Sequence, residues 1–276
     1  MTIHAWLHHA SETLRQAAIP SSRLDAELLL AHTLRKPRTW LHAHADEELS
    51  DRHYEIAEAR LDLRLDRVPI AYIIGHKEFY GRTFKVTTAT LIPRPESEDL
   101  IELLNQALPR NERLLKDEPL RIVDVGTGSG ALGITAKLEH PELDVTLLDV
   151  SRHALLVAEE NARALEADIE AIQSNLLAQY PYVADCIIAN LPYVNPDWDR
   201  SPETNHEPAL ALFADDNGLA LIYELIDQTM TGLRVGGYLI LEADPEQHAD
   251  LIAYAGKKHL AQVEVRGYGV LLQKLA

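Results

Sequence analysis

Residues 184–196, "ADCIIANLPYVNP", end a buried-strand pattern with side chains that could position a nitrogen atom for reaction: Asn190, Leu191, Pro192 and Tyr193. An amide or aromatic amine nitrogen is a poor nucleophile because its lone pair is delocalised. Acceptors for its N–H groups must therefore hold it in line with an electrophilic carbon. The Asn190 side-chain oxygen and the Leu191 carbonyl can be those acceptors. Pro192 stiffens the turn, and the Tyr193 ring can pack on a flat group. The alternative is an ordinary turn after a strand.

A glycine-rich segment, "VDVGTGSGALG" at residues 123–133, is the second candidate. Gly126, Gly128 and Gly130 permit a tight turn and a close approach of a ligand to the backbone, and the helix expected next presents free N–H groups. Asp149 follows about twenty residues later at the end of a predicted strand, where a carboxylate can bind ribose hydroxyls. A nucleoside cofactor is predicted, and the loop by itself fits both NAD and S-adenosylmethionine.

The two candidates are expected to meet at one edge of a sheet. In a doubly wound sheet with strand order 3-2-1-4-5, strands one and four are neighbours, and both segments leave the sheet at its carboxyl edge. Asn190 should therefore lie beside the reactive end of the cofactor. Hydride transfer has no evident use for acceptors there, whereas transfer of a carbon group to nitrogen needs them.

The elements that would position these residues divide the chain into three parts. Residues 1–75 carry helical spacing and predict a small helical domain, and residues 76–119 predict a β-hairpin, a helix and a polar connector. Residues 120–276 alternate strands and helices, which indicates an α/β doubly wound, mostly parallel sheet. The expected strands are 120–126, 144–150, 169–174, 184–190 and 236–243, with a hairpin over 262–275, and the expected helices are 97–108, 130–140, 151–165 and 218–233.

Composition limits the classes of partner and location. The formal net charge is -17, from 43 acidic and 26 basic residues, so tight binding to nucleic acid is not expected. The arginines of residues 60–67 are spaced as on a salt-paired helix surface. Cys186 lies in an apolar run and is expected to be a core thiol, and His4 and His8 lack a third ligand, so no metal site is predicted. With neither a signal peptide nor a membrane span in the sequence, a cytoplasmic location is expected.

The sequence resembles the S-adenosylmethionine-dependent methyltransferases that modify the glutamine of peptide-chain release factors. The resemblance covers nearly the whole chain. It rests on "SRLDAELLLAHTL", "RVPIAYIIGHKEFYG", "TLIPRPESEDLIE", "IVDVGTGSGALGI", "LLDVSRHAL", "ANLPYV" and "HEPALAL". The helical part would bind the body of a release factor while its Gly-Gly-Gln loop enters the cleft.

The resemblance implies a class I methyltransferase-like fold, S-adenosylmethionine as cofactor and two sets of site residues. It implies a substrate amide bound by Asn190, Leu191, Pro192 and Tyr193, and a cofactor bound by Asp124, Gly126, Thr127, Gly128, Ser129, Gly130, Asp149, Asn175, Leu176 and Asn190. This sequence departs from the family pattern at Leu191, where proline is usual, and at Asn175 and Leu176, where an aspartate and an aromatic residue are frequent.

Three hypotheses about function remain open at this point. The first is the methyltransferase of release factors. The second is an adenine-N6 or ribosomal-protein glutamine methyltransferase that uses the same Asn-x-Pro-Tyr pocket. The third is a binding module that keeps the cofactor fold without turnover, which the intact Asn190, Pro192 and Tyr193 disfavour. Ribosomal-RNA adenine dimethyltransferases share Asn-Leu-Pro-Tyr but place their helical domain after the glycine loop, the reverse of this chain.

Overall fold

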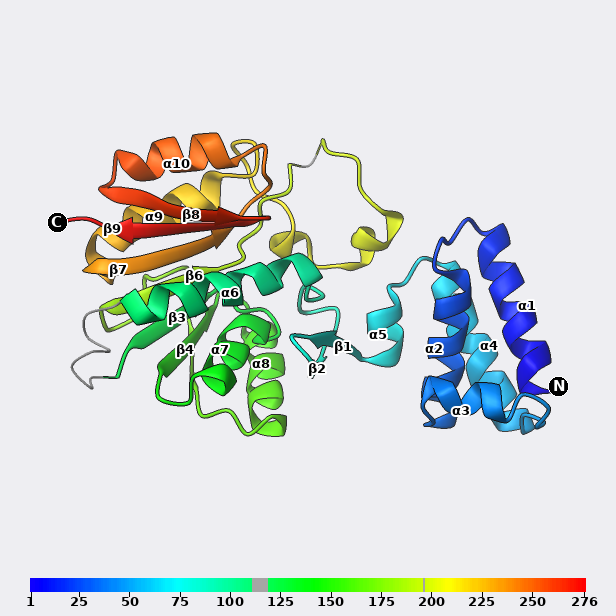
Figure 1. Cartoon of the computed structure of the whole chain (residues 1–276). Helices are drawn as coiled ribbons and strands as arrows, with labels where there is room; N and C mark the ends of the chain where they lie inside the picture. Colours follow the sequence, from blue (N-terminus) through cyan, green and yellow to red (C-terminus); the bar gives the residue numbers. More distant parts are fainter. Residues whose placement is uncertain (111–118, 196) are drawn as a thin grey trace. The chain divides into compact units, whose positions relative to one another are not determined.

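The computed structural model describes residues 1–110, 119–195 and 197–276, and the described chain forms two compact units (Figure 1). One unit comprises Met1–His76 with Arg200–His206, and the other comprises Lys77–Asp199 with Glu207–Ala276. Most of the polar connector expected at residues 109–119 lies outside the described residues.

The first unit is helical, as its spacing predicts. Its helices are α1 (Ile3–Gln16), α2 (Ser22–Leu34), α3 (Arg38–Ala43), α4 (Asp51–Leu65) and α5 (Ile70–Ile74). Apolar positions on successive turns meet in one core, with Trp6, Leu14, Leu29, Leu30 and Leu41 fully buried. Thr2 caps the N-terminus of helix α1, because its side chain accepts a hydrogen bond from the Ala5 amide.

An ion-pair cluster ties together separate parts of this unit. Arg64 of α4 bonds the Asp25 carboxylate of α2 at 2.7 Å and the Glu203 carboxylate at 3.0 Å. Arg67 contacts Glu203 at 3.4 Å. The surface pairing expected for the arginines of residues 60–67 is thus wrong for Arg64, because its side chain is buried and pairs across helices.

The second unit is built on a seven-stranded sheet. Its strands are β3 (Arg121–Val125), β4 (Asp144–Asp149), β5 (Glu170–Gln173), β6 (Ala184–Ala189), β7 (Leu233–Glu242), β8 (Leu260–Arg266) and β9 (Gly269–Lys274). They lie in the order β5-β4-β3-β6-β7-β9-β8, and the first five are parallel. The predicted order of five parallel strands and the antiparallel closing hairpin are confirmed. A separate small hairpin, β1 (His76–Phe79) with β2 (Arg82–Lys85), precedes the sheet.

Helices cover both faces of the sheet, because neighbouring strand residues alternate between two cores. The helices are α6 (Glu98–Ala107), α7 (Ala131–Glu139), α8 (Arg152–Ala164), α9 (Ala220–Gly232) and α10 (His248–Gly256). Helices α6, α7 and α8 share a core with Ile122 and Ile188, whereas α9 and α10 share one with Val123 and Ile187. Sequence periodicity did not predict α10. Ser151 caps α8 as expected from its position, accepting from the Ala154 amide at 3.3 Å.

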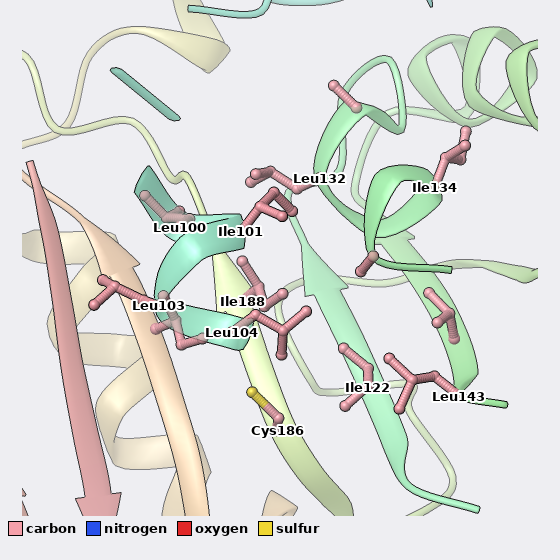
Figure 2. Packing of buried hydrophobic residues seen from close by; sticks show 14 of the residues in the cluster. Leu100, Ile101, Leu103, Leu104, Ile122, Leu132, Ile134, Leu143, Cys186 and Ile188 are labelled. Atoms are coloured by element: carbon pink, nitrogen blue, oxygen red, sulfur yellow. The ribbon is translucent and has the colours of Figure 1, made fainter. Parts of the chain in front are cut away.

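Figure 2 shows the first of these cores. Side chains of α6, among them Leu100, Ile101 and Leu104, belong to one cluster with Ile122 of β3 and Ile188 of β6. Cys186 lies in the same core at 2% exposure, and burial raises the pKa of its thiol. The prediction that this cysteine is a packed core residue is therefore confirmed.

Ile188→Ala should lower the free energy of unfolding by roughly 2–5 kcal/mol, because it leaves a cavity beneath α6 in a fully buried position. Urea unfolding followed by circular dichroism measures the change. Val235→Ala on β7 is the control, since Val235 is 58% exposed and its loss should cost less than about 1 kcal/mol. Equal losses for the two variants would contradict the assigned core.

Candidate active site

A cavity of about 360 Å³ lies at the carboxyl ends of β3, β4 and β6. Ten of the residues expected at the site line it: Gly126, Thr127, Gly128, Ser129, Asp149, Asn175, Leu176, Asn190, Leu191 and Pro192. Three do not line it, namely Asp124, Gly130 and Tyr193. The switch point between β3 and β6 therefore brings the glycine loop and the Asn-Leu-Pro segment into one pocket, as a doubly wound sheet requires.

The glycine loop turns sharply as it leaves β3. The amides of Gly126 and Thr127 both donate to the Leu148 carbonyl, at 2.8 and 2.9 Å, and the φ of Gly126 is 72°. A Cβ at Gly126 would lie 2.9 Å from the Leu191 side chain. The left-handed turn thus favours glycine, and a larger residue here would also require the Leu191 side chain to shift. Leu191 contributes a buried side chain here, besides the backbone carbonyl that the sequence assigned to it.

Asp124 lies beneath the loop and braces it. Its Oδ2 accepts from the Thr127 hydroxyl at 2.6 Å and from the Gly133 amide at 2.9 Å. The side chain is 1% exposed, and Oδ1 has no hydrogen-bond partner among the described residues. Burial raises the pKa of Asp124 to about 6, and the nearby charge of Asp149 adds to the rise. The role that this geometry gives Asp124 is to hold the loop, because its carboxylate does not reach the pocket wall.

Asp149 faces the pocket from the end of β4. Its two oxygens accept from the Gly128 amide at 2.9 Å and from the Ser151 amide at 2.8 Å. Burial raises the pKa of this carboxyl, and the backbone hydrogen bonds partly oppose the rise. Each carboxylate oxygen keeps a second lone pair, so Asp149 can still accept hydrogen bonds from a pair of ribose hydroxyls.

Asn190 directly follows β6, and its side-chain amide is held in one orientation. Its Nδ2 donates to the Ser97 hydroxyl at 2.9 Å, which leaves Oδ1 free of that contact. Tyr193 does not line the pocket, and its hydroxyl donates to Glu242 Oε1 at 3.0 Å. Burial raises the pKa of the Tyr193 phenol. The pocket thus offers an amide acceptor after β6, whereas the Tyr193 ring, expected to pack on a flat group, is not part of the lining.

Asn175 and Leu176 form another part of the wall, after β5. The Asn175 amide donates to the Gln179 side chain at 2.8 Å, and Leu176 has a left-handed φ of 50°. Leu176 is nearly buried, so an apolar surface faces the cavity at this point. This surface suits the flat face of a nucleobase.

The opposite wall was not assigned from sequence. Its residues come from two distant segments: Thr90, Leu91, Pro93 and Ser97 from one, and Pro208, Leu210 and Ala211 from the other. Glu207 joins the segments, because its carboxylate accepts from the Ile92 amide at 3.1 Å and forms an ion pair with Arg94. The only sequence signal for this wall was the family motifs "LIPRPESE" and "HEPALAL", since no local pattern links residues so far apart.

The residues present fit a nucleoside cofactor with a charged, polar tail. The wall combines the Asp149 carboxylate, which can accept hydrogen bonds from hydroxyl groups, with an apolar strip at Leu176 and glycine backbone; at Gly128 an added Cβ would meet nothing within 4 Å. No group of three His, Cys, Asp or Glu side chains is placed to hold a metal ion in the described parts of the chain. Among the same residues, no helix is long and apolar enough to cross a membrane.

The seven-stranded sheet and its pocket define a class I methyltransferase-like protein, and two solved structures share this fold. An rRNA methyltransferase of T. thermophilus, solved in complex with AdoMet and guanosine, is 17% identical with a TM-score of 0.52, covering 73% of this chain and 50% of its own. A methyltransferase from Pyrococcus furiosus is 15% identical with a TM-score of 0.53, covering 79% of this chain and 98% of its own. At these identities the likeness concerns the fold alone.

Sequence relatives identify the family. Residues 5–75 match the PrmC N-terminal domain, and residues 101–206 match the methyltransferase small domain. Proteins named release factor glutamine methyltransferase are 38% identical in Koribacter versatilis, over 89% of each chain, and 35% identical in Escherichia coli, over 88% of this chain and 86% of that one. The chain belongs to the release factor glutamine methyltransferase family.

Asp124→Asn should change how stability depends on pH. The pKa of Asp124 rises from 3.8 to about 6 on folding, so the folded state binds the proton more tightly than the unfolded state. The carboxyl therefore contributes stability below about pH 4 that is lost as the pH rises to about 6, a total on the order of 3 kcal/mol.

Urea unfolding of both proteins at several pH values tests this. The wild-type free energy of unfolding minus that of the variant should fall between about pH 4 and about pH 6 and then stay level. A difference that is constant over the whole range would show that Asp124 ionises as freely in the folded chain as in the unfolded one.

Proposed function

We propose that this protein transfers a methyl group from S-adenosylmethionine to the side-chain amide nitrogen of the glutamine in the Gly-Gly-Gln motif of peptide-chain release factors. The family's name supports the substrate class. The observation that carries the proposal is Asn190, which lies on the pocket wall beside the glycine loop with its Nδ2 already bonded to Ser97. An acceptor oxygen is thereby available for the substrate amide.

Some residues of the pocket would bind S-adenosylmethionine, and others would bind the substrate glutamine. Asp149 would accept the ribose hydroxyls, the apolar strip at Leu176 would contact the adenine, and residues 126–130 would approach the amino-acid tail. When bound, S-adenosylmethionine supplies a methyl group on a sulfonium centre that is electrophilic without activation by the protein. The chain's own task is then to orient the substrate nitrogen.

Asn190 Oδ1 and the Leu191 carbonyl would each accept one N–H of the glutamine amide. With both hydrogen atoms fixed, the face of the nitrogen points toward the methyl carbon, and the entropic cost of alignment is met on binding. Transfer would form the N–C bond as the sulfonium C–S bond breaks, and the proton that the amide nitrogen must lose would pass to solvent. Pro192 limits the freedom of the turn that presents the carbonyl.

The helical unit would dock the body of the release factor, so we assign residues 1–75 to substrate recognition and residues 120–276 to catalysis, with residues 76–119 between them. A protein partner suits a chain of net charge -17 better than a nucleic acid does. A cytoplasmic location, where release factors act, follows from this substrate.

Asp149→Ala should weaken S-adenosylmethionine binding by about 1.5–3 kcal/mol, because the ribose hydroxyls lose a charged acceptor. Isothermal titration calorimetry measures the affinity. Asp144→Ala is the matched control, since Asp144 lies at the opposite end of β4 with an exposed side chain and should bind like wild type. Unchanged affinity of Asp149→Ala would remove this residue from the cofactor site.

The function is tested by methyl transfer from labelled S-adenosylmethionine to an intact release factor, a short Gly-Gly-Gln peptide, a ribosomal protein and RNA. Label on the glutamine of the release factor is expected, with a higher kcat/KM for the intact factor than for the peptide. Label on adenine or on the ribosomal protein instead would replace this assignment. Equal kcat/KM for factor and peptide would argue against a docking surface outside the pocket.

Asn190→Ala should reduce turnover of the release factor roughly 100- to 1,000-fold, by analogy with removal of one preorganised hydrogen bond elsewhere. The affinity for S-adenosylmethionine should change far less, because the glycine loop and Asp149 hold the nucleoside. Steady-state kinetics and calorimetry separate the two effects. Turnover at the wild-type rate would mean that β6 ends in a turn without a part in the reaction.

A further inference from the structure

Glu242 is a buried carboxylate that the roles above leave unused. It ends β7, the strand that pairs with β6, and is 1% exposed. Its Oε1 accepts from the Tyr193 hydroxyl, and its Oε2 has no hydrogen-bond partner among the described residues. Burying a carboxylate with one oxygen that lacks a hydrogen-bond donor destabilises the folded state. Packing alone therefore does not explain a glutamate at this position.

The groups around Glu242 are those that hold Asn190. Burial raises the pKa of Glu242, and hydrogen bonding from Ser97, Tyr193 and Asn190 opposes that rise. Ser97 Oγ accepts from Asn190 Nδ2, so the hydroxyl hydrogen of Ser97 remains to be donated. The Glu242 carboxylate is an acceptor for this hydrogen, which would extend a chain of hydrogen bonds from β7 to the pocket wall.

We propose that Glu242 is a positioning residue for methyl transfer, which acts through Ser97 to keep the Nδ2 of Asn190 turned inward and its Oδ1 turned toward the substrate. The proposal rests on the function proposed above. Glu242 itself does not line the pocket, whereas Ser97 and Asn190 do.

The chemical reason lies in the symmetry of an amide. The two ends of the Asn190 side chain are nearly equal in size, and only hydrogen bonding distinguishes them. A flipped amide would present N–H groups to the N–H groups of the substrate and lose the acceptor that aligns the nitrogen. An acceptor-only carboxylate behind Ser97 favours donors that point toward it, so it selects one of the two orientations.

The test combines Glu242→Gln, Ser97→Ala and the double variant. Each single change should lower kcat for the release factor by up to about 100-fold while the affinity for S-adenosylmethionine stays within about twofold, because the defect is one of alignment. The double variant should be little worse than the poorer single variant, since both changes break one chain of hydrogen bonds. Wild-type kcat in Glu242→Gln, or multiplicative losses in the double variant, would overturn the proposal.

Asp185→Asn is the matched control for loss of a buried carboxylate. Asp185 is fully buried near the opposite end of β6, where it accepts from the Arg121 amide and from Arg234 Nε, both at 3.0 Å. Its replacement should lower the melting temperature and leave kcat of the folded enzyme unchanged. A fall in kcat equal to that of Glu242→Gln would show that the loss follows from general destabilisation, against the proposal.

A readout without substrate separates this proposal from the proposed function. The side-chain amide protons of Asn190, assigned in NMR spectra by their loss in Asn190→Ala, should exchange slowly with water in the wild type. They should exchange at least several-fold faster in Glu242→Gln and in Ser97→Ala, because the inward hydrogen bond is weakened. If the release factor is not methylated, the proposed function is refuted, but the exchange measurement still tests whether Glu242 orients Asn190. Unchanged exchange rates in both variants would refute the positioning role of Glu242.

Discussion

The approach of the segment after β6 to the glycine loop is the contact on which the site depends. Strands β3 and β6 are paired in parallel, so both segments leave the sheet side by side. Gly126 allows the Leu191 side chain to occupy the space where any other residue would place a Cβ. A Cβ at Gly126 would force the Leu191 side chain to move and would place a non-glycine residue at a left-handed φ of 72°, so the loop and the segment after β6 could not keep their present packing.

Buried carboxylates hold the backbone segments that surround the pocket. Asp124 braces the glycine loop, Glu207 joins two distant parts of the outer wall, and Glu242 accepts a hydrogen bond from Tyr193 in the segment after β6. Burying a carboxylate is unfavourable unless it is hydrogen-bonded, so each one fixes a specific set of donors. Burial of these carboxylates destabilises the folded chain, but their hydrogen bonds fix the positions of the pocket walls. A fixed pocket is what alignment of a weak nucleophile requires.

Fold and specificity belong to different parts of the chain. The fold of the sheet unit is shared with methyltransferases that are only 15–17% identical, so this fold does not define the substrate. We propose that the Asn-Leu-Pro-Tyr segment restricts the acceptor of the methyl group to nitrogen. We also propose that the helical unit, which matches a family domain of its own, recognises the protein partner.

The sequence by itself determined the elements whose signals are local. Alternating strand and helix patterns predicted the sheet and its strand order, glycine spacing predicted the loop, and Asp149 and Asn190 were predicted from their positions at strand ends. The short helix α10 was missed by periodicity. Tertiary structure alone decided the outer wall, the Ser97 contact of Asn190 and the burial of Asp124 and Glu242. These features depend on contacts between residues far apart in the sequence, such as Ile92 and Glu207. The packing of the whole unit brings such residues together, so no periodic pattern in the sequence predicts the contact.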